Sequence, residues 1–117
     1  MTASVCDVTF RRLRHSPALE QFIEERTNWL QQFAPVPIGL RAVIDAAHRH
    51  GHEHPIRVQL RIEVPGEEPI TVDREEIGDV YTLVCDTFDI ARRRLQDSVR
   101  EQRGFVKSHS NASRRIL

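Results

Sequence analysis

Basic side chains recur at helical spacing near the carboxyl end of the chain, and their chemistry is suited to binding phosphate. The row consists of Arg93, Arg100, Arg103 and Lys107, with the neutral Gln96 among them, and it is continuous if the helix persists past Gly104. On a helix, steps of three and four residues place side chains on one face. Successive cations on such a face can contact successive phosphates along an RNA backbone and release counterions. The row therefore indicates a polyanion-binding face, with Arg92 at its border.

The same row has a second interpretation, in which it binds nothing. Exposed helix faces are commonly charged, and cations near the end of a helix interact favourably with its dipole. Arg94 differs from its neighbours, because Asp97 and Glu101 follow it at or near the spacing of helical side-chain pairs. We therefore expect Arg94 to have a structural role.

Four histidines alternate with other residues ahead of Pro55, and imidazole is a good ligand for zinc, nickel and copper. They are His48, His50, His52 and His54. In an extended strand they would all lie on one side. Gly51 and Pro55 indicate a loop instead, and no cysteine lies nearby. We therefore predict no metal site and no cofactor, with the four histidines kept as a metal-binding alternative.

Charge is distributed unevenly along a chain whose formal net charge is zero. Residues 63–89 are strongly acidic and contain Arg74 as their single base, whereas residues 92–117 are strongly basic. This asymmetry predicts a polarised surface. It also leaves a third hypothesis open, in which the acidic stretch 63–89 binds a basic protein partner.

Residue patterns typical of enzymes are missing from the sequence. The glycines are scattered, so there is no phosphate-binding loop, and no Gly-x-Ser-x-Gly motif occurs. Neither Cys6 nor Cys85 has an obvious base beside it. We therefore expect no catalytic activity and no small-molecule substrate.

The hydrophobic periodicity predicts the element order β-α-β-β-β-α. The expected strands begin near Val5, Leu40, Ile56 and Ile70, the first of them ending around Leu13. Ser16-Pro17 starts the first helix, and Pro35 and Pro37 stop it. The second helix runs from Val80 to about Gln102, where Gly104 offers a cap. Two amphipathic helices and a half-exposed sheet predict an α+β fold, with both helices on one face of a four-stranded sheet.

The length of 117 residues indicates one domain. We assign residues 1–107 to it and residues 108–117 to a disordered tail. No apolar run is long enough to cross a membrane, no signal peptide is recognisable, and two distant cysteines make no disulfide framework. These features predict a cytoplasmic protein without a membrane partner.

Several motifs together resemble the family of hibernation-promoting factors and ribosome-associated translation inhibitors. The most specific is Asp79-Val80-Tyr81-Thr82 at the start of the last helix, followed by Phe88-Asp89 and Arg92-Arg93-Arg94-Leu95. Thr9-Phe10-Arg11, Ser16-Pro17-Ala18-Leu19-Glu20 and His48-Arg49-His50 are similar as well. The ending Arg103-Gly104-Phe105-Val106-Lys107-Ser108-His109 resembles a subgroup in which a cold-shock domain follows. The resemblance spans residues 5–109.

This resemblance implies the fold given above and a role in stress or stationary phase. The family binds ribosomal RNA in the cleft of the small ribosomal subunit and blocks translation there. Carried over by position, Arg93 matches the basic residue that precedes the leucine of this helix in the family, and Arg100 and Lys107 lie farther along the same face. We therefore predict that the RNA-binding residues are Arg92, Arg93, Arg100, Arg103 and Lys107, with Arg11 and Arg14 as weaker candidates from the first strand and its exit. Tyr81 is expected to be a packed ring and not a base-stacking platform.

Some features depart from the family pattern. The known inhibitors are more basic, and Glu20, Glu24 and Glu25 occupy the outward face of the first helix, where they would repel phosphate. The long family members also carry a C-terminal dimerisation domain that this sequence does not match. We therefore expect a monomer with modest affinity.

Overall fold

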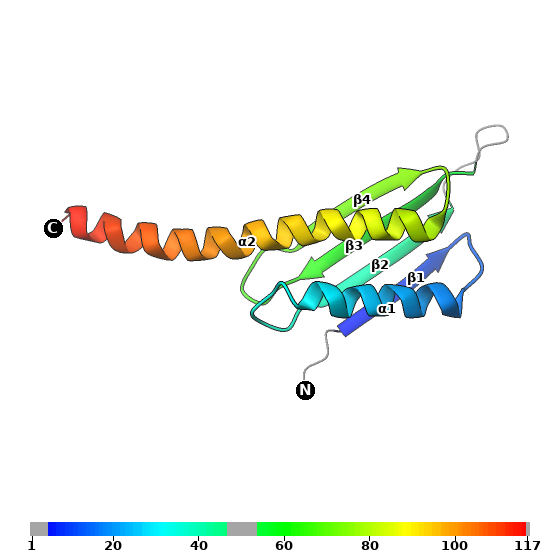
Figure 1. Ribbon diagram of the computed structural model, residues 1–117, viewed down its shortest axis with the longest axis horizontal. Helices are drawn as coiled ribbons and strands as arrows, with labels where there is room; N and C mark the ends of the chain where they lie inside the picture. Colours follow the sequence, from blue (N-terminus) through cyan, green and yellow to red (C-terminus); the bar gives the residue numbers. More distant parts are fainter. Residues whose placement is uncertain (1–4, 47–53, 117) are drawn as a thin grey trace.

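A four-stranded mixed sheet is covered on one face by two helices (Figure 1). The computed structural model describes residues 5–46 and 54–116, with side chains as far as residue 101. The elements are β1 (Val5–Arg11), α1 (Pro17–Gln31), β2 (Gly39–Ala46), β3 (Ile56–Glu63), β4 (Ile70–Glu76) and α2 (Val80–Ile116). The strands lie in sequence order, with β1 parallel to β2 and the other neighbours antiparallel. The predicted fold class and element order are confirmed.

Helix α1 connects the two parallel strands, and local signals fix both of its ends. The Ser16 hydroxyl accepts a hydrogen bond from the Leu19 amide at 3.2 Å, with Pro17 as the first helical residue. At the other end, the side-chain amide of Gln31 donates to the Val36 carbonyl and accepts from the Ile38 amide, both at 2.8 Å. Gln31 therefore fixes the connection that leads into β2.

A tight turn lies in the connection between β3 and β4. The Glu67 amide donates to the Val64 carbonyl at 3.0 Å, and Gly66 between them has a φ of 80°. Proline followed by glycine at positive φ is the pattern of a type II turn. In β3, Val58, Leu60 and Ile62 are buried under the helices, as their alternation predicts.

The core lies between the helices and the sheet. The predicted stripe of α2 is buried at Leu83, Val84, Thr87, Phe88, Ala91 and Leu95, and α1 adds Leu19, Ile23, Thr27 and Leu30. The two buried threonines are satisfied by their own helices, since each hydroxyl donates to the carbonyl one turn earlier. The stripe of α2 is therefore fixed against the sheet, and the opposite side of the helix faces water.

Two predicted boundaries are wrong. The backbone of α2 continues past Gly104 to Ile116, so residues 108–116 are helical where a disordered tail was expected. Glycine inside a helix costs only about 1 kcal/mol relative to alanine, which does not by itself end the helix. Strand β1 ends at Arg11 and not near Leu13, because Arg12 has a φ of 55°. The domain boundary at residue 107 stays a prediction.

Candidate nucleic-acid interface

The start of α2 is fixed by a side-chain cap. One carboxylate oxygen of Asp79 accepts from the amide and from the hydroxyl of Thr82, both at 3.0 Å. Tyr81 packs edge-on against Phe22 of α1, with ring centroids 5.1 Å apart. Tyr81 is therefore a partly packed ring, as predicted, and it ties the start of α2 to α1.

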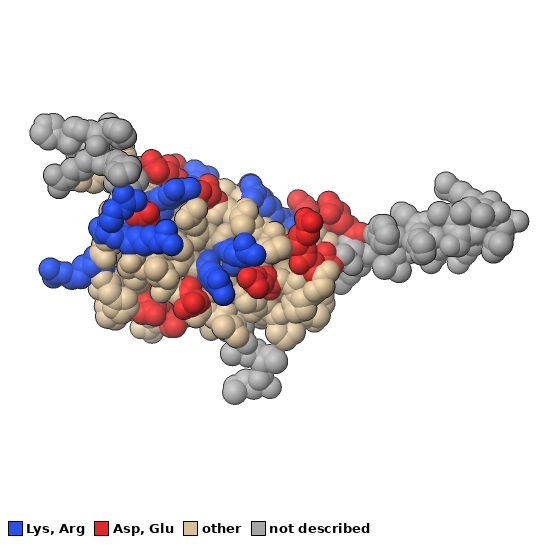
Figure 2. Space-filling view, turned by 180° about the vertical axis from the view of Figure 1, so that it is seen from behind, with Lys and Arg blue, Asp and Glu red and all other residues tan. Residues whose placement is uncertain are grey.

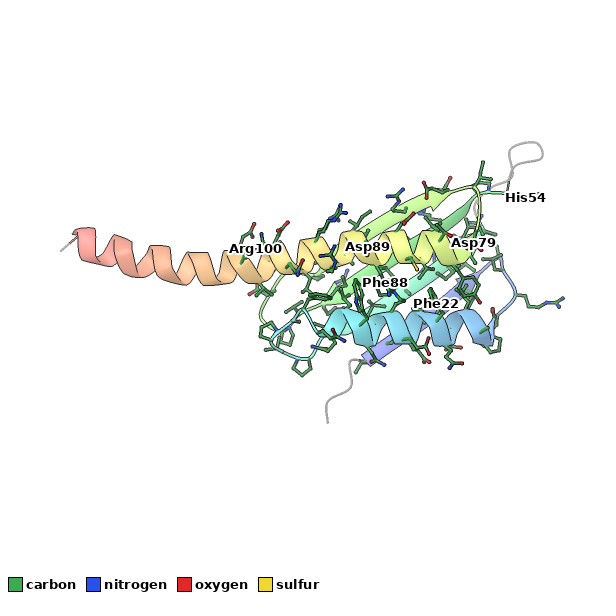
Figure 3. The ribbon with its side chains drawn as sticks, in the orientation of Figure 1. Phe22, His54, Asp79, Phe88, Asp89 and Arg100 are labelled. Atoms are coloured by element: carbon green, nitrogen blue, oxygen red, sulfur yellow. The ribbon has the colours of Figure 1, made fainter. Side chains whose placement is uncertain are left out.

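Among the members of the predicted basic row whose side chains are described, Arg93 and Arg100 are exposed on α2 and Gln96 is partly buried. Arg93 is exposed and has no ion-pair partner among the described residues. Arg100 is exposed where α2 leaves the body of the domain, 3.8 Å from Asp97 (Figure 3). Arg92 is half-buried and donates to Gln96 at 3.0 Å. Arg103 and Lys107 continue the helix, and their side chains lie outside the described residues.

Arg94 has the structural role that we predicted, with a different partner. Its guanidinium donates to the backbone carbonyl of Thr71 in β4. Asp97, which we predicted as a partner of Arg94 from its spacing, instead lies near Arg100. Arg94 therefore ties α2 to the edge strand of the sheet and is turned away from the basic row.

The structure does not bring Arg11 and Arg14 together with the row on α2. In β1, Cys6, Val8 and Phe10 pack against the core, so Arg11 points to the opposite, outer face of the sheet. Both arginines belong to the end of the sheet where α2 begins. Arg93 lies about 18 Å farther along α2 than Tyr81, at 1.5 Å per residue. The predicted residues therefore form two separate surfaces.

Positive and negative side chains are interspersed on the outer face of the sheet (Figure 2). Near the end of β1, Arg12 binds the buried Asp45 through two hydrogen bonds of 3.0 and 2.9 Å. Arg11 and Arg57 are the cross-strand neighbours of Asp45. Arg12 lowers the pKa of Asp45, chiefly through these hydrogen bonds, while burial acts in the opposite direction. Sequence reasoning missed this pair because its members are 33 residues apart.

Asp45→Asn should reduce the sensitivity of the domain to acid. A carboxyl whose pKa is lower in the folded than in the unfolded chain stabilises the fold at pH values above its unfolded pKa of about 4. This stabilisation is lost as the pH decreases through the pKa of the folded chain. The variant should therefore melt at a lower temperature near neutral pH and lose less stability than wild type below about pH 4. Thermal unfolding followed by circular dichroism across this range measures the difference. Asp7→Asn, an exposed carboxylate on the same face, is the control, and parallel curves for all three proteins would contradict the assignment.

Several acids of the stretch 63–89 have arginine partners on the sheet. Glu63 pairs with Arg61 at 3.2 Å, Glu76 pairs with Arg74 at 3.0 Å, and Asp73 binds Arg57. Arg57 lowers the pKa of Asp73 by hydrogen bonding. Several acids of the stretch are thus neutralised within the sheet, which weighs against a docking site for a basic protein.

Most of the histidine run lies outside the described residues. Only His54 is described, exposed at the end of the molecule opposite to Arg100 (Figure 3). Among the described residues, no three histidine, cysteine, aspartate or glutamate side chains come close enough to hold a metal ion. The metal-binding alternative at His48, His50 and His52 stays a hypothesis.

The three acids of α1 differ in environment, since Glu24 and Glu25 are exposed as predicted and Glu20 is not. Glu20 is partly buried and pairs with His15 at 2.6 Å. Glu24 lies on the side of α1 near Cys6 of β1, where its charge, together with burial as the larger cause, raises the pKa of the Cys6 thiol. Cys6 and Cys85 are free thiols. The side of α1 near α2 carries Phe22, Arg26 and Trp29, and Phe33 follows just after the helix ends.

No helix in the described part of the chain is long and apolar enough to cross a membrane.

Comparison with solved structures finds the same fold. The N-terminal domain of Thermus thermophilus Protein Y superposes with a TM-score of 0.68 at 16% sequence identity, covering 80% of this chain and 97% of that one. A ribosomal subunit interface protein from Coxiella burnetii gives a TM-score of 0.55 at 19% identity, covering 85% and 97%. No curated protein matches the sequence.

A family model identifies the chain. Residues 6–103 match the model described as "Sigma 54 modulation protein / S30EA ribosomal protein". The match includes β1 through β4 and the core-facing part of α2. It confirms the family that the motifs at Asp79-Val80-Tyr81-Thr82 and Arg92-Arg93-Arg94-Leu95 predicted. This chain therefore belongs to the sigma 54 modulation and S30EA ribosomal protein family.

Proposed function

We propose that this protein binds ribosomal RNA on the small ribosomal subunit and reduces translation, as a cytoplasmic hibernation or stress factor. The observation that carries the proposal is the family match over residues 6–103. The solved relative from Coxiella burnetii, described as a ribosomal subunit interface protein, supports the same location. The protein acts as a monomer and without a cofactor.

The exposed side of α2 supplies the chemistry for this function. Arg93 and Arg100 point away from the core, and Arg103 and Lys107 follow on the same helix. Guanidinium groups present a planar fork of donors that fits phosphate oxygens. The Asp97 carboxylate near Arg100 is an exposed partner, and exposed ion pairs contribute little. A phosphate can therefore replace Asp97 at little cost.

Co-sedimentation on sucrose gradients tests the proposal. The purified protein is mixed with intact ribosomes and with isolated subunits, at low and at moderate salt. We expect enrichment on the small subunit that decreases as salt increases, because phosphate contacts release counterions. A parallel in vitro translation reaction should slow as the protein is added. The absence of small-subunit enrichment at both salt concentrations would contradict the proposed function.

A further inference from the structure

Two arginines are held against aromatic rings in the seam between α1 and α2. The guanidinium carbon of Arg26 lies 4.1 Å from the ring centroid of Trp29, and that of Arg92 lies 5.9 Å from the centroid of Phe33. Trp29 and Phe33 meet edge to face, with centroids 5.2 Å apart. One aromatic pair therefore carries a cation at each end. We call these four residues the seam cluster.

Neither guanidinium of the seam cluster is neutralised within the described chain. No carboxylate there lies within ion-pair distance of Arg26 or Arg92, and the hydrogen-bond partner of Arg92 is the neutral amide of Gln96. The buried Nε of Arg26 has no hydrogen-bond partner. Stacking on Trp29, and not an ion pair, therefore holds Arg26 in place.

The other arginines in the described part of the chain either have a carboxylate partner or are exposed to water. On the sheet, Arg12, Arg57, Arg61 and Arg74 each bind a carboxylate. A half-buried arginine without a carboxylate is costly unless an anion arrives, because its donors have lost part of their water. A guanidinium held flat also loses less conformational freedom when it binds. These properties suit a planar contact with a phosphate group.

We propose that the seam cluster is a phosphate-binding subsite that extends the basic row of α2 across to α1. Arg26 and Arg92 contact the phosphodiester backbone of RNA, and Trp29 and Phe33 are positioning residues that hold the two guanidiniums. The inference rests on the proposed function and adds a contact from α1 to it. RNA is the ligand because Arg92 directly precedes Arg93 in α2, and Arg93 belongs to the basic row that we propose binds the RNA backbone.

Trp29 is the only tryptophan of the chain and provides a direct probe of this subsite. Adding poly(U), a single-stranded RNA without sequence information, should change the intensity or wavelength of tryptophan emission in the wild-type protein. Raising the salt concentration should reverse the change. Poly-glutamate, a polyanion without phosphate, should leave the emission nearly unchanged. An emission spectrum unaffected by RNA that is nevertheless bound would overturn the inference.

The decisive comparison is Arg26→Gln against Arg41→Gln, measured by filter binding to purified small subunits. Arg41 is exposed on the opposite face of the sheet and has no ion-pair partner in the described part of the chain, so both variants remove the same charge. Arg26→Gln should bind about tenfold more weakly and lower the slope of log K against log salt by about one. Arg41→Gln should match the wild type. Trp29→Leu should weaken binding and Trp29→Phe should restore it, because only the second keeps a ring under Arg26.

The outcomes separate the inference from the proposed function. If the wild type binds in a salt-sensitive manner and Arg26→Gln binds equally well, the seam cluster is not a subsite while the proposed function stands. If the wild type binds neither subunits nor poly(U), both are wrong. Thermal unfolding verifies that each variant is folded. Arg26→Lys, which keeps the charge and loses the planar fork, should give an affinity between those of the wild type and Arg26→Gln. If Arg26→Gln does not fold, Arg26→Lys takes its place in the comparison.

Discussion

Replacing Phe88 with alanine is expected to reduce the free energy of unfolding by about 3–5 kcal/mol, which is a large part of the stability of a domain of this size. Phe88 is fully buried, and in Figure 3 it lies on the side of α2 toward α1. Truncation removes the transfer free energy of the ring and leaves a cavity that the rest of the packed core, which includes Ile23 and Leu95, fills only in part. Urea denaturation measures the change.

Ile77→Ala is the matched control for this prediction. Ile77 is a large aliphatic residue but 59% exposed, so its truncation should change stability by less than about 0.5 kcal/mol. If Phe88→Ala does not fold, Phe88→Leu keeps most of the volume and should still unfold at a lower urea concentration than the wild type. A loss below about 1.5 kcal/mol in Phe88→Ala, with an unchanged urea dependence, would contradict the packing of this ring.

The fold was predictable because the core residues recur in the sequence at the periods of a strand and of a helix. The alternation of Val58, Leu60 and Ile62 and the stripe around Leu83 and Phe88 each define one apolar face, and only a few arrangements bury all of these faces together. The end of α2 was not predictable in this way. Gly104 is a local signal whose effect depends on the rest of the helix, and a cost of about 1 kcal/mol leaves both outcomes open.

The site was predictable only where one helix determines it. Arg93 and Arg100 share a face by spacing alone, and the structure places both on the exposed side of α2. Contacts across elements require the register between them. The pairing of Arg12 with Asp45 depends on how β1 lies beside β2, and the bond from Arg94 to the Thr71 carbonyl depends on how α2 crosses β4.

The seam cluster was predictable from the sequence only in part. Arg26, Trp29 and Phe33 are spaced at three and four residues, so their proximity at the end of α1 and just beyond it could be predicted from the sequence. The position of Arg92 over Phe33 could not, because it depends on the alignment of the two helices.

The double substitution Arg93→Glu/Arg100→Glu is expected to weaken binding to small ribosomal subunits by about 100-fold or more. Each lost cation–phosphate contact corresponds to about a factor of ten, and the new carboxylates repel the backbone in addition. Both side chains are exposed, so the thermal unfolding midpoint should change little. Sucrose-gradient co-sedimentation over a range of salt concentrations measures the affinity and its salt dependence together.

The outer face of the sheet offers a closely matched control, Arg41→Glu/Arg61→Glu. Arg41 is an exposed arginine without an ion-pair partner in the described residues, like Arg93, and Arg61 has an exposed acidic neighbour, Glu63, like Arg100. The two double variants therefore have the same net charge, and each removes one unpaired arginine and one exposed ion pair. If the positions on α2 form the interface, Arg93→Glu/Arg100→Glu loses binding and Arg41→Glu/Arg61→Glu does not. Equal losses would mean that binding follows the net charge of the chain, and a loss confined to the control would move the interface to the sheet, where Arg11 also lies.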